Sequence, residues 1–168
     1  MKLLALDTAT RSCSVAVTHD GSLSAELTIV KNQTHSKHLM ELIHSVLQIA
    51  DFHLADLDGL AVTIGPGSFT GLRIGMSYAK GFCYGQDIPL IPITNFELLA
   101  DLADDTVYPV YTLIEAGKGK YYAGIFEKDK THLNKKNLYH YILILIVHPY
   151  EHKLLSLQAG KLLIYYPI

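Results

Sequence analysis

The stretch Gly-Pro-Gly-Ser-Phe-Thr-Gly-Leu-Arg-Ile-Gly at residues 65–75 constrains the fold of this chain more than any other segment. It follows the apolar run 60–64 and leads into a helical pattern that extends to Gly85. This order predicts a strand, a tight glycine turn and a helix, which form a crossover unit of a parallel or mixed sheet. Ser68 and Thr70 are both candidates for the helix N-cap, because either hydroxyl can accept a hydrogen bond from a free amide of the first turn.

Small residues recur every four positions in this segment, at Gly67, Gly71, Gly75 and Ala79, and therefore fall along one face of the predicted helix. Each glycine inside a helix costs about 1 kcal/mol relative to alanine, so something must pack closely against this face. Two interpretations stay open. The face packs on the protein's own sheet or a neighbouring helix, or a partner protein docks there, in which case Gly71→Leu or Gly75→Leu is expected to block docking.

The glycine stretch does not match three familiar glycine motifs. A Walker phosphate-binding loop needs lysine and Ser/Thr where Leu72 and Arg73 follow Gly71. The dinucleotide-binding pattern lacks its third glycine, because Thr70 stands there. The hydrolase nucleophile elbow lacks the two glycines around Ser68. This loop therefore predicts neither a nucleotide site nor a nucleophile.

The composition is that of a globular protein without a general affinity for nucleic acid. The chain has 168 residues and a net charge of -2, enough for one domain, or one domain and part of a second. Cys13 and Cys83 are far apart and are expected to be reduced and buried. No run reaches the roughly 18 apolar residues of a membrane span, and an acidic residue comes too early for a signal peptide. We therefore expect a cytoplasmic protein.

Hydrophobic periodicity predicts the order of the elements. Three antiparallel strands are expected at residues 3–6, 14–18 and 23–29, with Asp20-Gly21 as a hairpin turn. A helix of about fifteen residues should begin near His35, with its apolar positions at helical spacing. After the glycine helix come a short strand at 88–93, whose prolines indicate a sheet edge or a strand end, and a helix capped by Asn95 that runs to residue 103.

A second strand–acid–turn–strand unit follows at residues 110–126 and suggests an internal duplication. When residues 114–125 are aligned without gaps to residues 6–17, Glu115 is aligned with Asp7 and Gly124 with Ala16. Two hairpins can also be similar by chance. We therefore expect a first lobe at residues 1–105 and the start of a second lobe at 106–168. Residues 131–168 differ in composition, and a buried strand at 143–147 is their clearest element. This suggests a second lobe that is truncated or aberrant after about residue 130.

Segments 6–10 (Leu-Asp-Thr-Ala-Thr), 13–17, 35–39 and above all 65–75 resemble the bacterial TsaB (YeaZ) family, and the resemblance extends over residues 2–126. It implies an α/β protein with an actin/hexokinase/Hsp70-like (ribonuclease H-like) lobe, built from a mixed β-sheet with flanking helices, and an incomplete second lobe. It also implies a non-catalytic subunit that binds TsaD and supports threonylcarbamoyl transfer to adenosine 37 of ANN-decoding tRNAs. The ATPase TsaE joins the complex, tRNA is reached only through it, and the subunit alone can form a homodimer.

In that family the two subunits pair through first-lobe helices, here residues 35–50 and 70–85. The partner-interface residues that the resemblance implies lie on these helices and at the glycine loop: His35, Leu39, Leu42, Ile43, Val46, Ser68, Thr70, Gly71, Arg73, Ile74, Gly75, Ser77, Tyr78 and Ala79.

Active nucleotide-binding relatives of this fold carry glycines in the first hairpin turn, but here that turn has none. Asp7, Thr8, Thr10 and Arg11 offer a weak phosphate site at most, so no cofactor beyond weakly bound ATP or ADP is expected. The alternative function is an autonomous ATP-dependent phosphotransferase or ATPase of the same fold. The histidine spacing near residue 35 does not predict a metal site, and a protease has no fixed set of residues to support it.

Overall fold

The computed structural model describes residues 1–30, 35–102, 110–117, 120–126 and 162–166, with the backbone alone at residues 35–37, 117 and 162–166. By its internal contacts the chain divides into two units, Met1–Thr94 and Asn95–Ile168. The division falls before the helix that begins at Asn95, whereas the sequence placed this helix in the first lobe. Among the described residues, no helix is both long and apolar enough to cross a membrane.

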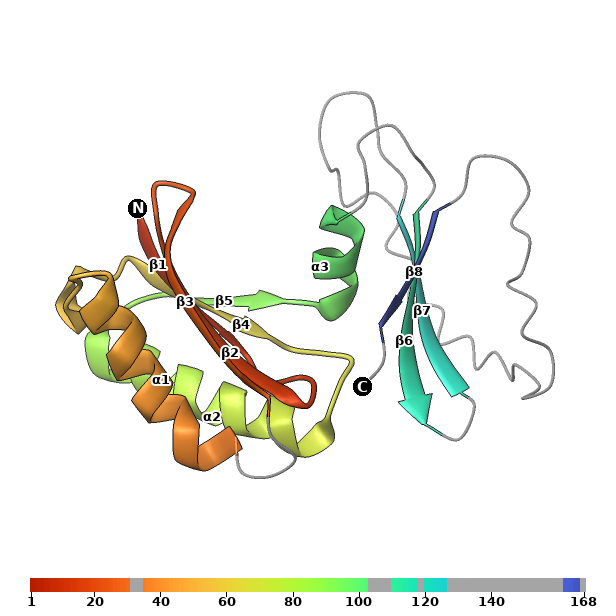
Figure 1. Cartoon of the computed structure of the whole chain (residues 1–168), viewed down its shortest axis with the longest axis horizontal. Helices are drawn as coiled ribbons and strands as arrows, with labels where there is room; N and C mark the ends of the chain where they lie inside the picture. The colour runs from red at the N-terminus through yellow and green to blue at the C-terminus, as the bar shows by residue number, and fades with distance from the viewer. Residues whose placement is uncertain (31–34, 103–109, 118–119, 127–161, 167–168) are drawn as a thin grey trace. The chain divides into compact units, whose positions relative to one another are not determined.

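The first unit is built on a five-stranded mixed sheet (Figure 1). Its strands are β1 (Lys2–Asp7), β2 (Ser12–His19), β3 (Ser22–Val30), β4 (Gly59–Thr63) and β5 (Leu90–Ile93), in the order β3-β2-β1-β4-β5. β2 is antiparallel to both β1 and β3, while β4 is parallel to β1 and to β5. The predicted antiparallel meander is therefore confirmed, and β5, with Pro92, is an edge strand as expected.

The hairpin between β2 and β3 turns at Asp20-Gly21, where both residues have positive φ, 49° and 79°. A two-residue hairpin turn of this type needs left-handed backbone at both positions, which aspartate and glycine tolerate best. The turn predicted from this dipeptide is confirmed.

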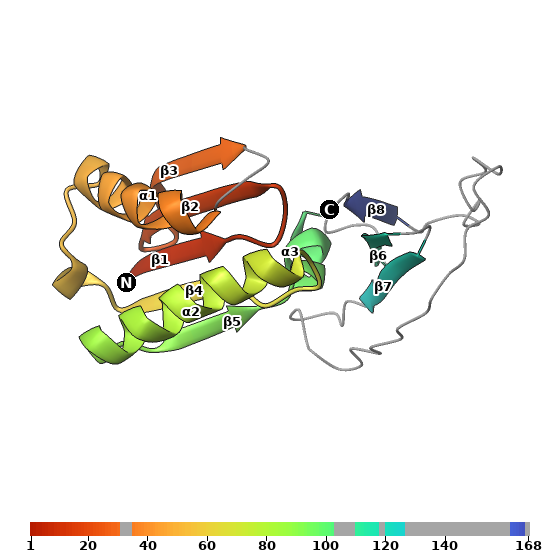
Figure 2. The same cartoon turned by 90° about the horizontal axis from the view of Figure 1, so that it is seen from below.

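Two helices lie side by side on one face of the sheet, α1 (His35–Ile49) and α2 (Phe69–Gln86) (Figure 2). α1 contacts β2 and β3, and α2 contacts β4, β1 and β5. The apolar positions of α1 face the sheet, as their spacing predicts, and form one core with Leu4, Val15 and Leu60. A short 3-10 helix, Leu54–Asp56, leads into β4. This mixed sheet with two flanking helices is the arrangement that the family resemblance implies for the first lobe.

Ser68 is the N-cap of α2, where its hydroxyl accepts a hydrogen bond from the Gly71 amide over 3.3 Å. The sequence left Ser68 and Thr70 as alternatives, and the structure selects Ser68. The helix ends at Asp87, whose left-handed backbone lets its amide donate to the carbonyl of Cys83.

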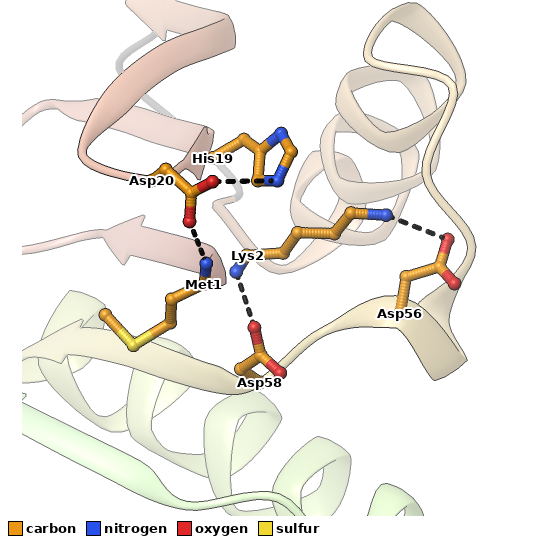
Figure 3. A network of polar contacts seen from close by, with 6 residues as sticks. All are labelled: Met1, Lys2, His19, Asp20, Asp56 and Asp58. Carbon is orange, nitrogen blue, oxygen red and sulfur yellow. Dashed lines mark hydrogen bonds and ion pairs between the residues drawn. The ribbon is translucent and has the colours of Figure 1, made fainter.

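A polar network joins the start of β1 to the segment before β4 (Figure 3). The Lys2 amide donates to Asp58 over 2.6 Å, and the Lys2 ammonium lies 3.6 Å from an Asp56 oxygen and 4.4 Å from the centre of the Phe52 ring. The His53 amide, which donates to Asp56, and Lys2 together lower the pKa of that carboxyl. This network anchors the N-terminal end of β1, which is the end opposite to the turn that follows Asp7.

Cys13 and Cys83 are both free and buried, as predicted. Burial, and secondarily the negative charge of Asp7, raises the pKa of the Cys13 thiol, and burial raises that of Cys83. Both groups are therefore neutral thiols packed in the core.

The second unit contains α3 (Asn95–Asp101), β6 (Val110–Gly117), β7 (Lys120–Phe126) and β8 (Leu162–Tyr166). β6 is antiparallel to β7 and parallel to β8, just as β1 is antiparallel to β2 and parallel to β4. This shared topology favours the duplication over chance similarity of two hairpins. The sequence did not predict β8, and the predicted strand at 143–147 and the predicted last residue of α3 (residue 103) lie outside the described residues.

Candidate functional site

The turn between β1 and β2 begins at Asp7, whose carboxylate holds the local structure together. One oxygen, Oδ1, accepts hydrogen bonds from the Ala9 amide (2.9 Å) and from the Thr63 hydroxyl at the end of β4 (2.8 Å). Asp7 therefore links the carboxyl ends of two parallel strands, β1 and β4, through hydrogen bonds within the protein.

The hydroxyls predicted to reach a phosphate are also used within the protein. Thr8 is fully buried and its hydroxyl donates to the carbonyl of Gly71, over 2.8 Å. The Thr10 hydroxyl lies 2.7 Å from the Ser12 hydroxyl and also accepts a hydrogen bond from the Ser12 amide. The side chain of Arg11 is exposed. The prediction that Thr8 offers its hydroxyl to phosphate is wrong, because that hydroxyl faces α2 and has no access to solvent.

The small-residue face of α2 is buried against this same turn. A Cβ atom on Gly71 would overlap the carbonyl oxygen of Thr8, and one on Gly75 would overlap the Thr8 hydroxyl. A Cβ atom on Gly67 would come within 2.6 Å of the Ala9 carbonyl oxygen. The same oxygen accepts a hydrogen bond from the Ser68 amide over 2.6 Å. Of the two open interpretations, packing on the protein's own sheet is therefore the correct one for this face.

The opposite face of α2 is exposed and carries a shallow groove of about 350 Å³. The groove is lined by Phe69, Thr70, Arg73, Ile74, Ser77 and Tyr78. The Arg73 guanidinium stacks on the Phe69 ring, 3.7 Å from its centre, although 68% of Phe69 remains exposed. Further along the helix Tyr84 is 93% exposed. Two solvent-exposed aromatic side chains on one helix, Phe69 and Tyr84, indicate a surface suited to a protein partner.

A second groove, of about 610 Å³, lies between residues 40–48 of α1, residues 51–54 and Phe82 near the end of α2. Its apolar wall includes Met40, Leu54 and Phe82, and its polar rim includes His44 and Gln48. The exposed faces of α1 and α2 thus carry two grooves in the first unit, one on α2 alone and one where the two helices meet.

The residues predicted for a partner interface separate into three groups. Seven of them are buried inside the first unit and cannot contact a partner: Leu39, Leu42, Ile43, Val46, Gly71, Gly75 and Ala79. Their spacing is correct for a helix face, but that face is the one that covers the sheet. Thr70, Arg73 and Ser77 are exposed and Ile74, Tyr78 and the N-cap Ser68 are half-buried, whereas the side chain of His35 lies outside the described residues.

The sequence analysis missed a second line of small residues on α2. Ser77, Gly81 and Gly85 also recur every four residues, and all three are exposed. This line is offset from Gly75 by two positions, which is about 200° around a helix, so it lies almost opposite the buried line. A Cβ atom on Gly81 or Gly85 would meet nothing within 4 Å. The spacing was visible in the sequence, but spacing alone does not tell which line faces inward.

Replacing Asp7 tests whether its role is structural. Asp7→Ala removes the acceptor of two hydrogen bonds, and we expect it to lower the unfolding free energy by about 1–3 kcal/mol. Asp7→Asn keeps an Oδ1 acceptor in the same place and should lose less than half as much. Urea unfolding followed by circular dichroism measures both. Equal losses in the two variants would mean that the negative charge, rather than the hydrogen bonds, stabilises the turn.

In the part of the chain that the structure describes, no group of three His, Cys, Asp or Glu side chains is arranged to hold a metal ion. Of the histidines near the start of α1, His38 has a partner of its own, since its Nδ1 lies 3.1 Å from an oxygen of Glu41.

Comparison with known proteins gives consistent results. A family model described as "TsaD: tRNA N6-adenosine threonylcarbamoyltransferase" matches residues 28–139, more than half of the chain. The tRNA threonylcarbamoyladenosine biosynthesis protein TsaB of Escherichia coli is 33% identical over 77% of this chain and 57% of its own length. TsaB of Haemophilus influenzae is 40% identical over 61% of this chain and 43% of its own length. The chain spans about half the length of these curated relatives.

The comparison with solved structures agrees with the comparison of sequences. YeaZ from Pseudomonas aeruginosa superimposes with a TM-score of 0.69 at 30% identity, over 77% of this chain and 61% of that protein. This likeness covers most of the chain and shows that the two proteins share a fold. The chain belongs to the TsaB (YeaZ) family, whose curated members are named for tRNA threonylcarbamoyladenosine biosynthesis.

Proposed function

We propose that this chain is a non-catalytic subunit of the machinery that makes threonylcarbamoyladenosine in tRNA, and that it binds a TsaD subunit through the exposed faces of α1 and α2. The observation that carries the proposal is the outer face of α2, where Phe69 and Tyr84 are exposed beside a groove and an open line of small residues. Such a line allows the backbone of a partner helix to approach closely, and exposed aromatic side chains supply apolar area to bury.

The turn at Asp7 supports a binding role over the alternative, an ATP-dependent phosphotransferase or ATPase. Asp7 and Thr8 use their polar groups to hold α2 and β4, and Thr8 is inaccessible to any ligand. The finer parts of the proposal follow from the family resemblance. They are activation of threonylcarbamoyl transfer to adenosine 37 of ANN-decoding tRNAs, recruitment of TsaE, contact with tRNA only through the complex, self-association of the free subunit, and location in the cytoplasm.

Ser77→Arg tests the proposed interface. Ser77 is exposed in the groove of α2, so a long charged side chain there should leave the fold intact and hold a partner helix away. We expect the wild-type chain and TsaD of the same organism to form a heterodimer, measured by size-exclusion chromatography with light scattering. We expect Ser77→Arg to raise the dissociation constant by at least about tenfold, which is a loss of about 1.4 kcal/mol of binding free energy.

The matched control is Ser24→Arg, the same substitution at an exposed position of β3. β3 is the edge strand at the far side of the sheet from β4 and β5, against which α2 packs. This control should bind TsaD as the wild type does. A folded Ser77→Arg variant that binds TsaD with unchanged affinity would remove α2 from the interface, and a folded wild-type chain that ignores TsaD would refute the proposed function.

A further inference from the structure

The side chain of Thr8 occupies a notch in α2 that is formed by two glycines, one helical turn apart. Its hydroxyl donates to the Gly71 carbonyl over 2.8 Å, and the Thr8 side chain is fully buried. A methyl group on Gly75 would collide with this hydroxyl, but it would lie 3.5 Å from the Thr8 Cβ, which is ordinary contact. At Gly75 the fit therefore depends on the Thr8 hydroxyl oxygen and on the absence of a Cβ, and at Gly71 the absence of a Cβ leaves room for the Thr8 carbonyl oxygen.

Further hydrogen bonds fix the turn that carries Thr8. Asp7 holds the Ala9 amide and, through Thr63, the end of β4. The Ala9 carbonyl accepts the amide of Ser68, the residue that caps α2. The turn is thus attached to the sheet on one side and to the first turn of α2 on the other, so its position determines the position of the helix.

We propose that Thr8 is a positioning residue for the exposed face of α2. It sets the depth and rotation of the helix on the sheet, and so determines how Thr70, Arg73 and Ser77 are presented to a partner. Because the notch and the exposed groove are on opposite sides of one helix, a shift at the notch moves the groove as well. The effect on partner binding rests on the proposed function, whereas the effect on the helix itself does not.

A double-mutant cycle with Gly75→Ala and Thr8→Ala tests this inference in the full chain. Gly75→Ala alone forces the helix away from Thr8, and we expect amide hydrogen exchange in residues 71–80 to become at least about tenfold faster. Thr8→Ala removes the colliding hydroxyl and leaves room for the new methyl group. The double variant should therefore return exchange to within about threefold of the wild type, a non-additive result expected for residues in contact.

TsaD binding supplies the second readout, and it should weaken in Gly75→Ala and recover in the double variant. Thr28→Ala on β3 is the control and should change neither readout. If the wild type does not bind TsaD, the proposed function fails, yet the exchange cycle still decides the role of Thr8. A Gly75→Ala chain that unfolds while the double variant folds would support the inference. Equal effects of Gly75→Ala with and without Thr8 would overturn it.

Discussion

Replacing Gly71 with alanine is expected to destabilise the first unit by about 3–5 kcal/mol, the range of the most damaging single substitutions. The added Cβ would overlap the carbonyl oxygen of Thr8, which is backbone and cannot rotate away. Relief requires α2 to move from the sheet, which breaks the hydrogen bond from Thr8 to Gly71 and opens the core around Ala79 and Cys83. Urea unfolding followed by circular dichroism measures the loss.

The same substitution at Gly81 is the matched control, because it lies on the same helix with open space around the new Cβ. There we expect alanine to stabilise the protein, by up to about 1 kcal/mol, since it is the better helix former. Two identical substitutions ten positions apart should thus have opposite signs. A mild effect at Gly71, similar to that at Gly81, would show that α2 does not pack on the turn as described.

Leu60→Ala is expected to produce the second large effect, a loss of about 3 kcal/mol. Leu60 is fully buried in β4, between β1 and β5, and belongs to the core that α1 and α2 cover. Alanine leaves a cavity there, because the paired strands on both sides restrict how far the backbone can close the gap. The measurement is again the free energy of unfolding in urea.

The control for this substitution is Leu23→Ala. Leu23 is 61% exposed on β3, so truncation there should change the unfolding free energy by less than about 0.5 kcal/mol. If Leu60→Ala were as mild as Leu23→Ala, β4 would not be an interior strand of a packed sheet.

These expectations separate two roles of the glycine segment. Gly71 and Gly75 permit α2 to contact the turn at Thr8, so Gly71→Leu and Gly75→Leu, which the sequence suggested as tests of partner docking, would test folding instead. Substitutions that probe docking belong on the exposed line at Ser77, Gly81 and Gly85. A loss of binding in a Gly75 variant alone would not distinguish an altered surface from a displaced helix.

The sequence by itself determined the local elements of this protein. Period-two alternation and Asp20-Gly21 predicted the opening meander, and the spacing of Leu39, Ile43 and Val46 predicted α1. Ser68 was one of two predicted caps for α2. These features depend on residues close together in the chain, whose backbone preferences and alternation of polar and apolar side chains act within a few positions. The family resemblance then supplied the fold class, which the sheet order and the likeness to YeaZ confirm.

Only the tertiary structure decided which line of small residues on α2 faces inward. Both lines have the same spacing, and the difference between them is the position of Thr8, sixty-three residues before Gly71. It also decided that Asp7 bonds to Thr63 and that β8 pairs with β6, since both contacts join segments far apart in the chain. Periodicity identifies the face of an element, but the partner of that face depends on how distant segments pack, and no local pattern contains that information.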